Sequence, residues 1–481
     1  MTSRRHSLLF KPLLKPFLKF LSKLLLKPVS KPLLKSMLKH LSILYLITAL
    51  IPAAITAAEI APKTPRLADE AQRLFNTHQS SILQIRVIEL TSGNKASIGS
   101  GFLINSNGLI ATNFHVISNS VHHPDRYRLE YVKADNTTGD LSLVDIDVVH
   151  DLAIVRSDIR DTTPLTLGSS DLSKGTKIFS LGNPHDLGLS IVEGTYNGLL
   201  EKSLFDKIFF SGSLNPGMSG GPTLNRQGHV VGINVSTAGN QLSFLVPVNY
   251  LKILTDNAET VDKTPIDHFD QRIEQQLRQH QSLYIKQLVA SDWPTTQLGP
   301  FTLPGAISGV VKCWGNSDDN PKALIDHATS NCFSEDRIFL SQRFTTGGFA
   351  YTYDLYANKA LSSVHFYNLY GANFGRTIRV NSADKEAVSN YQCHTEFVAL
   401  NHKDWKIAYC ARNYIKYPSL FDITVTIAMV SDNHQGLIVK LAAAGVDKES
   451  ADAFTNKFIN AIQYGPLSPN PAEKPSIGEG S

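Results

Sequence analysis

The first 58 residues of this chain contain no aspartate or glutamate, yet they hold ten lysines and arginines. The formal charge of +4 for all 481 residues is therefore misleading: of the 46 basic residues only 36 lie beyond residue 58, against 42 acidic ones, a net charge of −6. Proteins that bind nucleic acid present a basic surface. A body of net negative charge predicts that nucleic acid is not a partner.

The basic segment has the order of regions found in a secretory signal peptide. Lysine recurs at every fourth residue from Lys11 to Lys39, and the prolines between the lysines disfavour a regular helix. The uncharged stretch 41–58 follows and ends in small residues. We expect cleavage after Ala58 and export to the periplasm or the medium. The alternative is an uncleaved signal anchor that holds the protein on a membrane through residues 1–58.

Cysteine is scarce, and none precedes residue 313. The chain has four cysteines, none of them in a Cys-x-x-Cys pair: Cys313, Cys332, Cys393 and Cys410. An even number in an exported chain favours two disulfides over a zinc site. Four cysteines allow three connectivities. We prefer the sequence-local bridges 313–332 and 393–410, because about 60 residues separate the two pairs, and we expect them to hold a C-terminal domain that is independent of catalysis.

Metal-binding patterns are also lacking among the histidines. His122, His123, His150 and His185 do not have the spacing of metal ligands. We therefore expect neither a metal ion nor another cofactor.

Residues 67–256 contain many short apolar runs separated by turns. Residues 101–104 and 109–112 flank Asn107 and Gly108, and an Asn-Gly pair between such runs predicts a β-hairpin. Further runs with strand character follow, at 152–155, 178–181, 208–210, 229–235 and 244–246. Closely spaced strands with few helical stretches predict an all-β barrel or sandwich.

Beyond residue 256 the pattern changes. Apolar residues recur near one helical face over 265–292, which predicts a linker helix. Residues 293–466 return to strand-like runs, with a last helix over 447–463, and indicate a β-rich α+β domain of unassigned function. The tail 467–481 is rich in proline and glycine, which predicts disorder. The chain is thus expected to be mainly β, with two domains joined by a helix.

The strongest chemical signal is the octapeptide Asn-Pro-Gly-Met-Ser-Gly-Gly-Pro at 215–222. A serine nucleophile must stand on a tight turn, with backbone N–H groups beside it to stabilise an oxyanion. Glycines at 217, 220 and 221 permit the unusual backbone angles of such a turn. Ser219 is therefore a candidate nucleophile, although a glycine-rich turn can contain a serine by chance.

A histidine and an aspartate precede this serine in the order that one type of catalytic triad uses. His115 follows the apolar run 109–112, and Asp151 comes directly before the run 152–155. Asp145 and Asp147 are competing candidates for the aspartate. The same triad geometry occurs in several chain orders on unrelated folds, and His, Asp, Ser is one of them.

These segments resemble the trypsin-like serine proteases of the HtrA (Deg) group over about residues 75–256. The resemblance rests on the blocks 99–104, 111–117, 151–155, 180–184, 215–222 and 244–247, which keep their order and approximate spacing. It implies a double six-stranded β-barrel with the active site between the barrels. It also implies that His115 is the general base, that Asp151 orients it and that Ser219 is the nucleophile. The N–H groups of Gly217 and Ser219 would form the oxyanion hole.

The resemblance has limits. Met218 stands where family members often carry Asn or Asp, and no PDZ signature follows residue 256. Trimers are common in the family, so a homo-oligomer is compatible with the resemblance. Ser213, six residues before the nucleophile, would line the base of the primary pocket. Because no aspartate stands there to pair with Arg or Lys, a small-to-medium apolar residue is expected before the cleaved bond.

The sequence therefore predicts an exported serine endopeptidase that forms an acyl-enzyme and acts on polypeptides, with unfolded or damaged proteins as the expected substrates. The alternative is a catalytically silent or chaperone-like binding protein built on a protease fold.

Overall fold

The computed structural model describes residues 68–465, apart from 161, 240, 261–268, 319, 401–402 and 431–433. The segment 1–58, expected to be a signal, and the tail 467–481, expected to be disordered, lie outside the described residues. Among the helices that the structure does describe, none is both long and apolar enough to cross a membrane.

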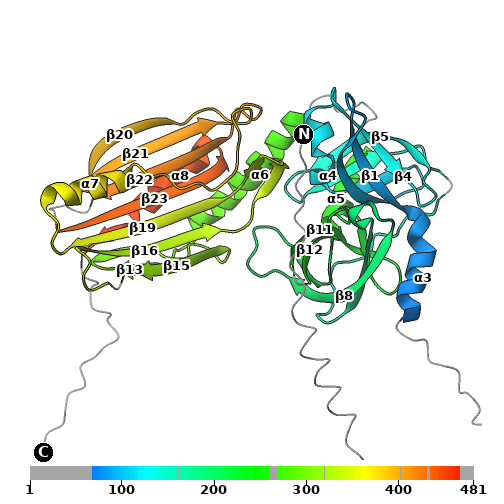
Figure 1. The fold of residues 1–481 in the computed structure, drawn as a ribbon, viewed down its shortest axis with the longest axis horizontal. Coiled ribbons are helices and arrows are strands. Elements are labelled where there is room, and N and C mark those ends of the chain that lie inside the picture. The colour runs from blue at the N-terminus through cyan, green and yellow to red at the C-terminus, as the bar shows by residue number, and fades with distance from the viewer. Residues whose placement is uncertain are drawn as a thin grey trace, which may run out of the picture. The chain divides into compact units, whose positions relative to one another are not determined.

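Two closed six-stranded barrels follow one another along the chain (Figure 1). The first has the order β1-β2-β3-β6-β5-β4 and consists of β1 (Ile82–Glu89), β2 (Lys95–Leu103), β3 (Leu109–Thr112), β4 (Tyr127–Val132), β5 (Thr138–Asp147) and β6 (Leu152–Arg156). The second has the order β10-β11-β12-β9-β8-β7 and consists of β7 (Lys177–Gly182), β8 (Ser190–Leu199), β9 (Ile208–Ser211), β10 (Pro222–Leu224), β11 (Val230–Gly239) and β12 (Leu242–Pro247). The mainly β fold predicted from the sequence is confirmed.

The predicted hairpin is present, because Phe102 pairs with Ala111 across β2 and β3. Short helices accompany the barrels: α3 (Ala68–His78), η2 (Gln79–Ser81), α4 (Phe114–His122), η3 (Pro184–Asp186) and α5 (Val248–Thr260). Helix α4 begins directly after β3. It is the element that carries His115.

The C-terminal region is built on a seven-stranded sheet with the order β15-β16-β19-β23-β22-β21-β20. Its strands are β15 (Val311–Ser317), β16 (Ile325–Ser334), β19 (Phe349–Asn358), β20 (Gln392–Leu400), β21 (Lys403–Asn413), β22 (Phe421–Met429) and β23 (Gln435–Val446). Two smaller sheets join it: β13 (Thr295–Leu298) with β14 (Phe301–Pro304) and β24 (Gln463–Tyr464), and β17 (Ile338–Ser341) with β18 (Phe344–Thr346). The helices are α6 (Phe269–Ala290), α7 (Ser363–Phe374) and α8 (Lys448–Asn460).

Helices cover both faces of the seven-stranded sheet (Figure 1). Alternate residues of a strand point to opposite faces. On β19, Tyr351 and Tyr353 pack with α8 and the second half of α6, whereas Tyr356 packs with α7. The helices at 265–292 and 447–463 predicted from their periodicity correspond to α6 and α8. Helix α7 was not predicted.

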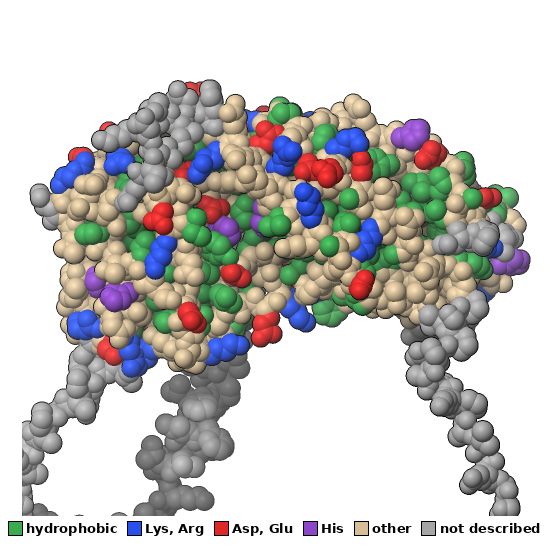
Figure 2. Space-filling view, turned by 180° about the vertical axis from the view of Figure 1, so that it is seen from behind, with side chains coloured by type: hydrophobic (Ala, Val, Ile, Leu, Met, Phe, Trp, Pro, Cys, Tyr) green, Lys and Arg blue, Asp and Glu red, His purple; other side chains and the backbone are tan. Residues whose placement is uncertain are grey.

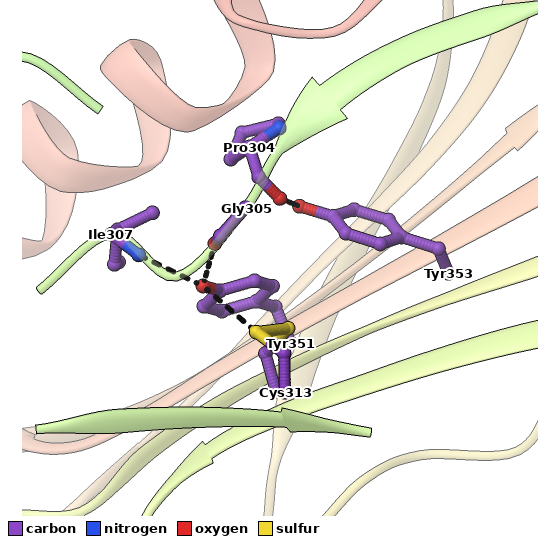
Figure 3. The surroundings of a disulfide bond; sticks show 7 residues. Pro304, Gly305, Ile307, Cys313, Tyr351 and Tyr353 are labelled. Carbon is purple, nitrogen blue, oxygen red and sulfur yellow. Dashed lines mark hydrogen bonds between the residues drawn. A yellow bond between two sulfur atoms is a disulfide. The ribbon is translucent and has the colours of Figure 1, made fainter. Parts of the chain in front are cut away.

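Both predicted disulfides are present, Cys313–Cys332 and Cys393–Cys410. Each bridge joins residues that pair directly across two antiparallel strands, β15 with β16 and β20 with β21. Because β15 and β20 are the two edges of the sheet, each bridge ties an edge strand to its neighbour. Beside the first bridge, the hydroxyls of Tyr351 and Tyr353 donate to backbone carbonyls of residues 304–305 (Figure 3).

The C-terminal domain and the first barrel share a hydrophobic core. Ile273 and Leu277 from the first half of α6 and Ile338 and Leu340 from β17 belong to one hydrophobic cluster with buried residues of that barrel and of α4. Arg272 of α6 also pairs with the buried Asp145, with 2.5 Å between Nε and Oδ1. In the structure this domain is packed onto the barrel that carries His115. Its expected independence of catalysis stays a prediction.

Charges of both signs are mixed on the surface of the described part. On the face that Figure 2 shows, lysines and arginines alternate with acidic side chains and do not gather into a wide patch.

Candidate active site

His115 and Asp151 form a close hydrogen-bonded pair. His115 Nδ1 lies 2.6 Å from Asp151 Oδ2, and the backbone N–H of His115 donates to Asp151 Oδ1 at 2.8 Å. That N–H belongs to the first turn of α4, where backbone donors have no partner inside the helix. The carboxylate of Asp151 therefore satisfies the start of the helix and orients the imidazole at the same time.

The position of Asp151 depends on a backbone conformation that aspartate tolerates. Its φ is +57°, in the left-handed region, which Asn and Asp visit more readily than other non-glycine residues. Its carbonyl accepts hydrogen bonds from Asn113 Nδ2 at 2.8 Å and from the N–H of Phe114 at 3.3 Å. These contacts attach the turn before β6 to the start of α4.

The environment of His115 favours its protonated form. Burial alone would lower the pKa of the imidazole, but the charge of Asp151 and the hydrogen bond to it outweigh burial, and the pKa is raised above the usual 6.5. An imidazole with a raised pKa is a stronger base for proton abstraction. This suits a general base that must take a proton from a hydroxyl.

Ser219 stands on a tight turn whose shape requires glycine. Gly217 and Gly220 have φ values of +96° and +83°. A Cβ at Gly217 would lie 2.4 Å from the carbonyl oxygen of Asn183, and one at Gly220 would lie 2.2 Å from the carbonyl oxygen of Ser100. Both positions therefore require glycine, because of the positive φ and because the neighbouring backbone leaves no room for a Cβ.

The hydrogen bonds of this turn use its carbonyls and leave two N–H groups available. The carbonyls of residues 215–219 all accept hydrogen bonds. Among the described residues, the N–H groups of Gly217 and Ser219 donate no hydrogen bond. These are the two donors predicted for an oxyanion hole.

The hydroxyl of Ser219 does not contact His115 in this structure. Ser219 Oγ donates to the carbonyl of Val235 at 3.0 Å, and no hydrogen bond joins it to His115 within the described chain. Catalytic hydrogen bonds are often loose before substrate binds. Rotation about the Cα–Cβ bond of Ser219 would redirect the hydroxyl.

Two residues that the sequence did not single out hold this turn in place. Ser100 is fully buried; its N–H donates to the carbonyl of Ser219 at 2.7 Å, and its Oγ donates to the carbonyl of Gly217 at 2.7 Å. Asn234 Nδ2 donates to the carbonyl of Met218 at 3.2 Å. Ser100 comes from the first barrel and Asn234 from the second, so both barrels fix the turn.

Met218, which departs from the family pattern, has an apolar environment. Its side chain is fully buried in the core of the second barrel, beside Phe210 and Leu245. A methionine there fills an irregular apolar space.

Two hollows adjoin the triad. The Ser219 pocket, of about 240 Å³, is lined by Leu214, Asn215, Pro216, Ser219, Val235, Ser236 and Thr237. The His115 cavity, of about 380 Å³, contains His115 and Asp151 and is lined by apolar and polar side chains of both barrels and by residues 337–339. Val235 and Ser236 line both. Ser213 is exposed and is not among the lining residues of either; its neighbour Leu214 lines the Ser219 pocket.

The other candidates from the sequence lie in different arrangements. Asp145 pairs with Arg272, and Asp147 pairs with His150, with 2.7 Å between the carboxylate and Nδ1. His122 Nε2 donates to the carbonyl of Leu340 at 2.8 Å. In the described part of the chain, no three or more His, Cys, Asp or Glu side chains are placed to hold a metal ion.

Comparisons with known proteins find similarity in the part of the chain that contains these residues. Residues 99–233 match the family model of the trypsin-like peptidase domain. The chain carries an HtrA-like, trypsin-like protease domain. This domain contains the candidate triad and both residues of the candidate oxyanion hole.

Several HtrA and Deg proteases are similar to the same part of the chain. The mitochondrial serine protease HTRA2 of Drosophila erecta is 32% identical over 173 residues, which are 34% of this chain and 40% of that protein. The chloroplastic Protease Do-like 1 of Arabidopsis thaliana is 31% identical over 212 residues, 38% of this chain and 46% of that protein. The crystal structure of Deg5 matches with 28% identity and a TM-score of 0.35, covering 40% of this chain and 94% of Deg5. The chain thus spans less than half the length of these curated relatives.

Proposed function

We propose that this protein is a serine endopeptidase that hydrolyses polypeptides through Ser219, His115 and Asp151. The observation that carries the proposal is the turn at Ser219, because the N–H groups of Gly217 and of Ser219 itself have no hydrogen-bond partner in the described chain. A carboxylate, Asp151, also holds Nδ1 of His115. Unfolded or damaged proteins are the proposed substrates, since an extended chain fits a cleft between two barrels.

In the proposed mechanism, His115 Nε2 takes the hydroxyl proton of Ser219 as Oγ attacks the scissile carbonyl. The N–H groups of Gly217 and Ser219 stabilise the resulting oxyanion. His115 then gives the proton to the leaving amine, and an acyl-enzyme on Ser219 remains. Water, activated by the same imidazole, hydrolyses the ester and restores the serine. Asp151 stabilises the imidazolium that forms in both halves of the reaction.

The direct test is labelling with a fluorophosphonate, which reacts with an activated serine. The full chain should be labelled on Ser219, and denatured protein should be cleaved. A second candidate function, a binding protein without protease activity, is favoured by one observation: Ser219 Oγ bonds to Val235 and not to His115. Absence of both labelling and cleavage in folded protein would favour that candidate.

The lining of the Ser219 pocket supports a preference at the residue before the cleaved bond. None of its lining residues is charged, and Leu214, Pro216 and Val235 provide apolar surface. Cleavage is therefore expected mainly after Val, Ala, Leu or Ile. Mass spectrometry of the products from a denatured protein measures this preference. A dominant preference for Arg or Lys would show that another residue forms the base of the pocket.

We also propose that the protein is exported. The argument rests on the basic segment and the uncharged stretch 41–58. The mature protein is expected to begin at or near Glu59, which N-terminal sequencing or intact-mass analysis of the exported protein determines. A full-length chain in the membrane fraction would instead support the anchor, with residues 1–58 as the membrane-bound part.

A further inference from the structure

The C-terminal domain contributes residues to the cavity that contains the candidate catalytic histidine. Arg337, Ile338 and Phe339 line the His115 cavity together with residues of both barrels. The ring of Phe339 stands edge-on to the imidazole of His115, with 6.0 Å between centroids and 76° between planes. A residue more than 200 positions away in the sequence therefore forms a wall beside the candidate general base.

The direction of Phe339 follows from strand geometry. Successive side chains of β17 point to opposite sides. Ile338 and Leu340 are fully buried in the core shared with the first barrel, whereas Phe339 between them is only partly buried. The two buried neighbours fix the strand, and Phe339 consequently faces the cavity.

Polar contacts fix both ends of this strand on the protease barrels. Asp336, two residues before it, accepts hydrogen bonds from Ser203 Oγ at 2.8 Å, from the N–H of Leu204 at 2.7 Å and from Lys207 Nζ at 2.5 Å. These three residues belong to the loop between β8 and β9 of the second barrel. At the other end, the carbonyl of Leu340 accepts from His122 of α4 in the first barrel. The strand thus bridges the two barrels.

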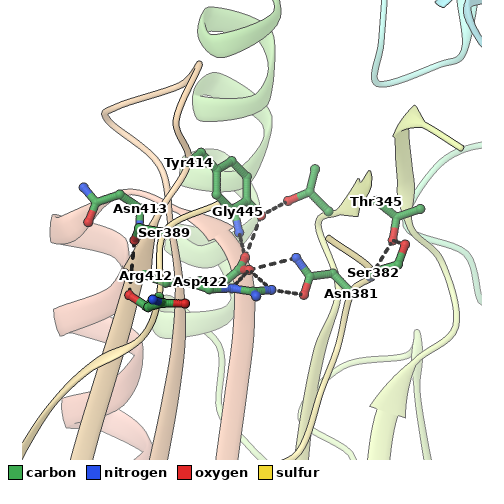
Figure 4. A network of polar contacts seen from close by, with 11 residues as sticks. Thr345, Asn381, Ser382, Ser389, Arg412, Asn413, Tyr414, Asp422 and Gly445 are labelled. Carbon is green, nitrogen blue, oxygen red and sulfur yellow. Dashed lines mark hydrogen bonds and ion pairs between the residues drawn. The ribbon is translucent and has the colours of Figure 1, made fainter. Parts of the chain in front are cut away.

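Strand β17 pairs with β18, and β18 is hydrogen-bonded to the C-terminal domain. Thr346 of β18 forms a 2.7 Å hydrogen bond with the hydroxyl of Tyr414, which donates to the buried Asp422 at 2.6 Å. Arg412 and Asn381 donate to the same carboxylate, as Figure 4 shows. A fully partnered buried network of this kind holds its members in one arrangement. The network attaches β18, which pairs with β17, to the C-terminal domain.

The two hollows lie side by side, and this arrangement indicates which side chain of a bound peptide would meet Phe339. Val235 and Ser236 separate the Ser219 pocket from the His115 cavity. In an extended peptide, neighbouring side chains point to opposite sides. If the residue before the cleaved bond occupies the Ser219 pocket, the side chain of its preceding neighbour is directed toward the His115 cavity.

We infer that Phe339 is a specificity-determining residue, which selects an apolar side chain one position before the residue at the cleaved bond. The cavity offers apolar surface to such a side chain, since Val148, Val149, Phe205 and Val235 are among its lining residues. Polar residues also line it, and three of them have a partner of their own: His150 pairs with Asp147, Asp206 accepts from Tyr250, and Lys207 pairs with Asp336. Arg337 also lines the cavity, and its Nη1 is held by the carbonyls of Ser334 and Asp336, both at 2.6 Å. The C-terminal domain thereby takes part in substrate selection. This inference rests on the proposed function.

The test compares cleavage of a peptide library by the full chain and by Phe339→Ala, with Phe397→Ala as the matched control. Phe397 lies on β20 with 69% of its surface exposed. Phe339→Ala should lower kcat/KM on the order of 10-fold for peptides with a large apolar residue at that position, while peptides with alanine there should change little. Phe397→Ala should keep the original profile. Phe339→Leu should retain most of the preference.

Fluorophosphonate labelling distinguishes a failure of the proposed function from a failure of this inference. Absence of labelling and cleavage in the unmodified chain would refute the proposed function itself. If the unmodified chain and all its variants are labelled, but Phe339→Ala keeps the original cleavage profile, this inference alone is refuted. An equal rise in the cleavage of every peptide would also refute this inference, because Phe339 would then obstruct the site for all substrates alike. If Phe339→Ala does not fold, the profile of Phe339→Leu decides: a partial loss of preference confined to that position supports the inference, and a profile equal to that of the unmodified chain refutes it.

Discussion

Replacement of Ser219 by alanine is expected to lower kcat on the order of 10⁶-fold, because the members of a triad act as a unit. The same loss is expected for His115→Ala, since the serine hydroxyl is a weak nucleophile until a base takes its proton. The double variant should be no slower than either single variant. Hydrolysis of an internally quenched peptide measures these rates.

Folding provides the control for these two variants. Ser219 Oγ makes one hydrogen bond, to the carbonyl of Val235, and the turn itself depends on backbone contacts with Ser100. Ser219→Ala should therefore keep the thermal unfolding midpoint close to that of the unmodified protein. Retention of cleavage by a well-folded Ser219→Ala protein would show that the nucleophile lies elsewhere.

Local sequence signals predicted most of the protease fold and the candidate triad. The Asn-Gly turn identified the β2–β3 hairpin, and each member of the triad stands in a short segment with a distinctive pattern of its own. The recurrence of apolar residues identified α6 and α8. These features depend on contacts between near neighbours in the chain, which a sequence pattern records directly.

What the sequence did not predict depends on contacts between distant residues. Residues 338–340 form a continuous apolar run, Ile-Phe-Leu. This run does not show that Phe339 faces the cavity while Ile338 and Leu340 are buried in the core. The partnership of Asp336 with Lys207 joins two domains and has no local signature. Helix α7 contains Gly371 and several aromatic residues, which are weak helix formers. It forms because Phe366 and Tyr370 bury one face against the sheet.

Asp151→Asn is expected to lower kcat about 10⁴-fold while preserving the fold. Asparagine keeps an oxygen to accept from the N–H of His115, so the start of α4 stays satisfied. Its amide, however, donates where the carboxylate accepted, and this moves the imidazole proton to Nε2, the atom that must act as the base. Steady-state cleavage of the quenched peptide as a function of pH measures the effect.

The dependence of cleavage on pH is a second measurement, and the direction of its change in the variant can be predicted. The base must be unprotonated, so cleavage by the unmodified protein should fall as the pH drops through the raised pKa of His115, above 6.5. Without the charge of Asp151, burial of the imidazole dominates and lowers this pKa, and the acidic limb of the variant should move to lower pH. Asp147→Asn is the matched control, because Asp147 pairs with His150; it should keep both rate and profile. Near-normal cleavage by Asp151→Asn, together with an inactive Asp147→Asn or Asp145→Asn, would show that a different aspartate orients His115.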